Sequence, residues 1–88
     1  MLFKDDVKSG LEKLNVTLND IEDVTEKHGF VSPEKLFELI EVSKEQSEYF
    51  YENPNHLENM YIGLADNYAR KSGVSVHLVE GDFEVSIV

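Results

Sequence analysis

Residues Ser32–Glu52, SPEKLFELIEVSKEQSEYFYE, carry glutamates at alternating intervals of four and three residues. At 100° per residue these intervals keep six carboxylates within roughly 40° of one line, over about 27 Å of α-helix. The opposite side offers a core-facing set: Leu36, Leu39, Ile40, Ser43, Ser47, Phe50 and Tyr51. The pattern predicts one long amphipathic helix over residues 33–52. Its polar face is named the acidic rail here: Glu34, Glu38, Glu41, Glu45, Glu48 and Glu52.

The acidic rail disfavours the helix that would carry it. Like charges three or four residues apart each cost a few tenths of a kcal/mol, so five successive pairs cost about 1–2 kcal/mol. Alternating lysine with glutamate would have stabilised the same helix. A local cost without a folding reason points to function, which makes the rail a candidate binding face. The competing interpretation is an ordinary solvated face of an acidic protein.

The segment before the rail predicts two shorter helices. Apolar residues at helical spacing indicate a helix over residues 3–14. Thr17 is a suitable N-cap, and Gly29 a suitable terminator, for a second helix over residues 18–28. The outer face of this second helix is also acidic, and we expect it to enlarge the binding surface: Asp20, Glu22, Asp23 and Glu26.

After the rail, Asn53 and Pro54 predict a helix break, because the residue before proline is pushed out of the helical region. A fourth helix is expected over residues 55–72, where apolar residues again recur at helical spacing. Gly73 can adopt the left-handed conformation that ends a helix. Directly after this glycine, the spacing of the apolar residues changes from helical to alternating.

The C-terminal residues alternate between apolar and polar, which predicts strands over residues 74–79 and 83–88. Gly81-Asp82 between them is a hairpin signal. A turn one residue earlier is the alternative, and it places His77 opposite Glu84. Unpaired strand edges favour pairing with another chain, so we expect a homodimer through the hairpin edges.

Together these elements predict an α+β fold: one small compact domain over residues 1–88, with about four helices followed by a C-terminal two-stranded antiparallel β-hairpin. The net charge is −10, and the segment from Asp20 to Glu58 holds 11 acids against three lysines. Such a field repels nucleic acid and anionic lipid and attracts basic proteins. We therefore expect a basic protein partner, no direct nucleic-acid binding and no membrane. The absence of cysteine and of an export signal favours the cytoplasm.

No motif for phosphate binding, nucleophilic catalysis, zinc or calcium is present in the sequence. His28 lies on an apolar helix face, where a structural role is expected, and His56 lies near a helix start. His77 is explained by a cross-strand pair. We expect no enzyme activity, no cofactor and no metal site.

The sequence thus predicts a small acidic protein-binding module. Its sharpest form is an inhibitor that presents a nucleic-acid-like acidic surface to a basic nucleic-acid-binding protein. In size and charge the chain resembles the small acidic proteins that phages and mobile elements use against restriction, CRISPR or repair enzymes, although no motif is shared. Tyr49, which flanks the rail, joins the candidate surface. The alternative is an adaptor, antitoxin or immunity-type protein that binds through the hairpin.

Overall fold

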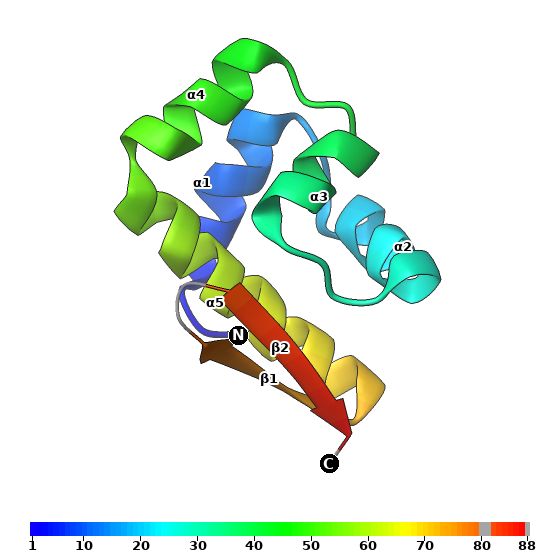
Figure 1. The fold of residues 1–88 in the computed structure, drawn as a ribbon. Coiled ribbons are helices and arrows are strands. Elements are labelled where there is room, and N and C mark those ends of the chain that lie inside the picture. Colours follow the sequence, from blue (N-terminus) through cyan, green and yellow to red (C-terminus); the bar gives the residue numbers. More distant parts are fainter. Residues whose placement is uncertain (80–81, 88) are drawn as a thin grey trace.

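The computed structural model describes the backbone of residues 1–79 and 82–87, and the side chains of residues 1–74 and 76. Helix α2 has the predicted bounds, and α1 and α5 each begin one residue away from the predicted start. Figure 1 shows the elements in this order: α1 Lys4–Leu14, α2 Leu18–His28, α3 Pro33–Leu39, α4 Lys44–Glu52, α5 Pro54–Ser72, β1 Val74–Val79 and β2 Asp82–Ile87.

The predicted α+β class is wrong. The described part of the protein is mainly helical, and it has five helices where four were expected. All the buried apolar residues among the described side chains lie on helices: Val7, Leu11, Leu14, Ile21, Leu36, Phe37, Phe50, Met60, Tyr61, Leu64 and Ala65. The helices bury one another's apolar faces, so the described core is formed by the helical part of the chain.

Helices α1 and α5 pack closely because each contributes a glycine to their contact. A Cβ atom at Gly10 would collide with the Met60 side chain. A Cβ atom at Gly63 would collide with the Val7 side chain and the Leu2 carbonyl oxygen. Glycine inside a helix costs up to about 1 kcal/mol relative to alanine. At these two positions close helix packing offsets that cost.

The predicted single helix over residues 33–52 is wrong, because the chain turns a corner between α3 and α4. Glu41 adopts the left-handed conformation, with φ of 55°. Its amide donates to the Glu38 carbonyl oxygen at 3.2 Å, and the Val42 amide donates to the Phe37 carbonyl oxygen at 3.1 Å. These two bonds form a Schellman motif, which ends a helix.

A capping box then starts α4. The Ser43 hydroxyl accepts a hydrogen bond from the Gln46 amide at 3.1 Å, and the Gln46 side-chain oxygen accepts one from the Ser43 amide at 2.7 Å. The Gln46 side-chain amide also donates to the Lys13 carbonyl oxygen at 3.1 Å. Carbonyl groups in the last turn of a helix lack intrahelical partners. This bond therefore satisfies the end of α1 and ties the corner to it.

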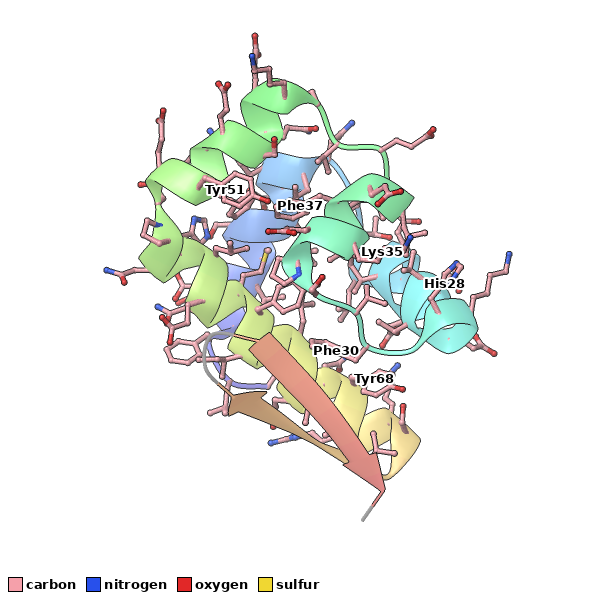
Figure 2. The ribbon with its side chains drawn as sticks, viewed as in Figure 1. His28, Phe30, Lys35, Phe37, Tyr51 and Tyr68 are labelled. Atoms are coloured by element: carbon pink, nitrogen blue, oxygen red, sulfur yellow. The ribbon has the colours of Figure 1, made fainter. Side chains whose placement is uncertain are left out.

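The corner changes which aromatic side chains are buried. Phe37, which a continuous helix would place beside the acidic rail, is only 5% exposed and packs 5.6 Å from Phe50 between ring centroids. Tyr51, which was expected on the core face, is 54% exposed. Figure 2 shows Phe37 on α3 and Tyr51 on α4.

The connection between α1 and α2 has the same hydrogen-bond pattern as the corner. Asn15 is left-handed with φ of 59°. Its amide donates to the Glu12 carbonyl oxygen at 3.1 Å, and the Val16 amide donates to the Leu11 carbonyl oxygen at 3.1 Å. Thr17 then caps α2, as predicted, and the structure adds a capping box with Asp20. Both connections between these short helices are thus Schellman motifs followed by capping boxes.

The two strands pair antiparallel, and Figure 1 shows them beside α5. The register places His77 opposite Glu84, which is the alternative alignment and not the one with a Gly81-Asp82 turn. The turn itself lies outside the described residues. The homodimer through the hairpin edges stays a prediction. Among the helices described here, none is both long enough and apolar enough to cross a membrane.

Candidate protein-binding surface

All six glutamates of the acidic rail are exposed, but the corner divides them. Two lie on α3, one lies at the corner and three lie on α4, in this order: Glu34, Glu38, Glu41, Glu45, Glu48 and Glu52. Lys35 lies 3.9 Å from Glu38, and Lys44 lies 3.8 Å from Glu48. Pairs of such exposed, flexible side chains contribute little energy. The carboxylates therefore remain largely open to solvent.

Part of the acidic face of α2 borders a groove beside α5. Asp20 is exposed, but its carboxylate is occupied by the capping box of α2. Asp23 and Glu26 are also exposed, and together with Glu22 they line one side of a groove whose other side is α5. The structure therefore brings three of the four predicted α2 acids to a single groove.

The groove between α2 and the C-terminal half of α5 has a volume of about 490 Å³. The buried side chains of Ile21 and Leu64 give it an apolar part, and the half-buried Tyr68 adds an aromatic ring from α5. The sequence did not predict this groove, because its two walls are separated by about forty residues of chain. Helical periodicity indicates which face is polar and does not identify the helix packed beside it.

A charged hydrogen-bond network crosses the groove. Lys71 Nζ lies 2.6 Å from Glu22 Oε2, and the Asn67 side-chain amide donates to the same oxygen at 3.1 Å. Both bonds favour the ionised carboxylate, and they hold the pKa of Glu22 below its usual value, with Lys71 the larger cause. Sequence analysis missed Glu22 and Lys71 as partners.

Tyr49, the predicted aromatic contact for a partner, takes part in an internal network. Its hydroxyl lies 2.8 Å from His56 Nδ1, and Lys13 Nζ lies 4.3 Å from the centre of its ring. His56 Nε2 lies 3.1 Å from the Asp6 carbonyl oxygen and 2.9 Å from Ser9 Oγ. The half-buried imidazole therefore joins α1, α4 and α5, a larger role than that of a residue near a helix start.

The same network argues against a serine nucleophile. A carbonyl oxygen only accepts hydrogen bonds, so the contact with Asp6 is a hydrogen bond in the tautomer that carries the proton on His56 Nε2. His56 Nδ1 then accepts from the Tyr49 hydroxyl. An imidazole in this tautomer cannot take a proton from the Ser9 hydroxyl, which is what nucleophile activation requires. The network holds three helices together.

His28 does not have the core position that was expected for it. Its side chain is exposed, and α2 ends at this residue. Figure 2 shows His28 at the outer end of α2. Within the described residues, no group of three or more histidine, aspartate or glutamate side chains is arranged to hold a metal ion.

No protein-family model, no curated protein and no solved structure matches the chain. Function therefore has to be inferred from the exposed carboxylates of α2, α3 and α4 and from the groove between α2 and α5.

Proposed function

We propose that this protein is a small acidic protein-binding module whose α2–α4 carboxylates bind a basic protein partner. The supporting observation is that nine of the ten predicted carboxylates are exposed, Glu22 being the exception. Exposed charges of one sign attract a partner of the opposite sign and speed its association. A cytoplasmic location, which the sequence favours, is part of this proposal.

An inhibitor of a nucleic-acid-binding protein is the most specific form of the proposal. The corner at Glu41 affects this form, because the carboxylates no longer follow one 27 Å line of the kind first expected. Any resemblance to a phosphate backbone would have to come from separate groups of carboxylates on three helices. The broader proposal, a basic partner, does not depend on a single line of charge.

The test compares two variants with the same net charge in affinity capture from a lysate of the source cells. The surface variant neutralises one exposed acid on each of α2, α3 and α4, chosen outside the ion pairs described above: Glu26→Gln, Glu34→Gln and Glu45→Gln. The control variant neutralises three exposed acids elsewhere: Asp5→Asn, Glu12→Gln and Glu58→Gln. Each variant carries three negative charges fewer than the wild-type −10.

We expect the surface variant to bind the captured partner about five- to thirtyfold more weakly than wild type at 50 mM salt, and the control variant to stay within about threefold. Raising salt to 500 mM should weaken the wild-type complex by slowing association. Equal binding by the two variants, or binding that ignores salt, would contradict the proposal. That result would move the search to surfaces away from α2–α4, the hairpin first.

A further inference from the structure

The groove between α2 and α5 already holds one cation of the protein's own. Lys71, in the last turn of α5, reaches across to Glu22 on α2. The lysine side chain is 62% exposed, whereas the glutamate side chain is 23% exposed. The carboxylate is thus the fixed partner of the pair, and the lysine is the one free to leave.

The groove is not neutralised by this lysine. Glu22, Asp23 and Glu26 line its α2 side, and Lys71 is the cation among its described lining residues. Three carboxylates against one ammonium leave an excess of two negative charges. A second cation would therefore be attracted to the same place.

The apolar part of the groove favours a particular kind of cation. The buried Leu64 side chain and the ring of Tyr68 offer a surface for an aliphatic stem. The Tyr68 ring packs against Phe30, with 5.5 Å between ring centroids, so its position is set before any partner arrives. A planar guanidinium stacks on aromatic rings and binds carboxylates through two parallel hydrogen bonds, which an ammonium cannot do.

We propose that this groove receives an arginine side chain of the basic partner, and that Lys71 occupies the position of its charged end until the partner displaces it. This inference rests on the proposed function, since it names the contact through which a basic protein is recognised. The ion pair between Lys71 and Glu22 then acts as an internal competitor. Its loss should strengthen binding, although it removes a contact from the free protein.

The test is a titration of the isotope-labelled full chain with a capped hexa-arginine peptide, followed by amide chemical shifts at 50 mM salt. Lys71→Met removes the internal competitor, and Lys8→Met is its control, because Lys8 is exposed on α1 and gives the same net charge. We expect Lys71→Met to bind the peptide about two- to fivefold more tightly than Lys8→Met, the range that a surface ion pair allows. Shifts should lie in α2 and in the second half of α5.

A second pair of variants tests the acidic wall. Glu26→Gln should weaken peptide binding about three- to tenfold, whereas Glu34→Gln, which removes the same charge from α3, should leave it within about twofold. Shifts centred on α3 and α4, or equal affinities for Lys71→Met and Lys8→Met, would overturn the groove as the site. Absence of peptide binding would overturn it as well. The capture experiment uses no peptide, so it decides the proposed function independently of these outcomes.

Discussion

The connections that follow α1 and α3 share one backbone conformation, but a different residue occupies the left-handed position in each. In both, a left-handed residue is followed by valine and then by a hydroxyl residue that caps the next helix. Asn15 is left-handed in the first connection, and Glu41 in the second. Asparagine tolerates this conformation because its short side chain can hydrogen-bond locally, whereas glutamate has no such advantage. The second connection therefore forms against the preference of its own residue.

This difference shows what holds the corner in place. The Val42 amide donates to the carbonyl oxygen of Phe37, and the ring of Phe37 is buried in the core. Ser43 and Gln46 cap α4, and Gln46 also donates a hydrogen bond to the end of α1. Tertiary contacts and caps on both sides outweigh the strain at one residue, which is about 1–2 kcal/mol. The first connection needs less support, because asparagine tolerates the left-handed conformation.

The largest expected effect comes from truncating Phe37. Phe37→Ala should lower the free energy of unfolding by about 3–5 kcal/mol, because it empties a buried aromatic site. Tyr51→Ala, at an exposed aromatic, should cost less than about 1 kcal/mol. Urea unfolding of both variants measures the contrast. A continuous helix over residues 33–52 would reverse this order. The reverse result would therefore show that the chain does not turn between α3 and α4.

The two caps should contribute about equally. Thr17→Ala and Ser43→Ala each remove a side-chain acceptor from a helix N-terminus, and each should cost about 1 kcal/mol of unfolding free energy. Ser72→Ala, at an exposed position in the last turn of α5, is the control and should change little. Thermal and urea unfolding would show the effect. If only Thr17→Ala destabilised the protein, the start of α4 would not depend on Ser43.

The left-handed residues should respond differently to glycine. Glu41→Gly should stabilise the protein by about 0.5–1 kcal/mol, because relief of the left-handed strain exceeds the added freedom of the unfolded chain. Asn15→Gly should change stability by only a few tenths of a kcal/mol. Glu48→Gly, in the middle of α4, should instead cost about 1 kcal/mol. Destabilisation by Glu41→Gly would mean that the side chain of Glu41 has a structural role.

The smallest effect concerns how the helix after each connection is tied down. α2 is tied to α5 by Glu22, whose pKa is lowered by Lys71 and Asn67, and α4 is tied to α1 by the uncharged Gln46. A lowered pKa in the folded state gives stability that is present above the usual value of 4.5 and is lost as pH falls below it. The cost of Glu22→Gln should therefore be below about 1 kcal/mol at pH 7 and shrink towards pH 3.5.

Gln46→Ala supplies the matched control for this pH series, since an amide does not titrate. Its cost should be the same at pH 7 and pH 3.5, in urea unfolding curves recorded side by side with those of Glu22→Gln. A cost of Glu22→Gln that stays constant over the same range would show that the Lys71 contact does not stabilise the folded protein.

Sequence signals for helix ends correctly predicted the helices that begin or end at residues suited to those positions. Thr17 and Gly29 bound α2, and Gly73 in the left-handed conformation ends α5, all as the sequence indicated. The corner was missed because the spacing of the glutamates is helical across it, while Glu41 gives no sign of a break. The signal that was present is Ser43 followed three residues later by Gln46, a capping box.

The candidate surface was only partly accessible to sequence reasoning. Exposure of the glutamates follows from their helical spacing, but the division of the acidic rail follows from the corner. The pairing of Glu22 with Lys71, and of Tyr49 with His56, depends on which helices pack together. Such contacts join residues distant in sequence, or separated by a bend, and no periodicity in one segment specifies them.

The two glycines between α1 and α5 have a consequence for how this protein can evolve. Gly10 faces Met60, and Gly63 faces Val7 and the Leu2 carbonyl, so a Cβ atom at either position would collide with these atoms and force them to shift. Acidic residues on the outer faces can exchange with little effect on the fold. Drift should therefore leave descendants that differ widely in surface charge, and so in the partners they attract, while sharing glycine at positions 10 and 63.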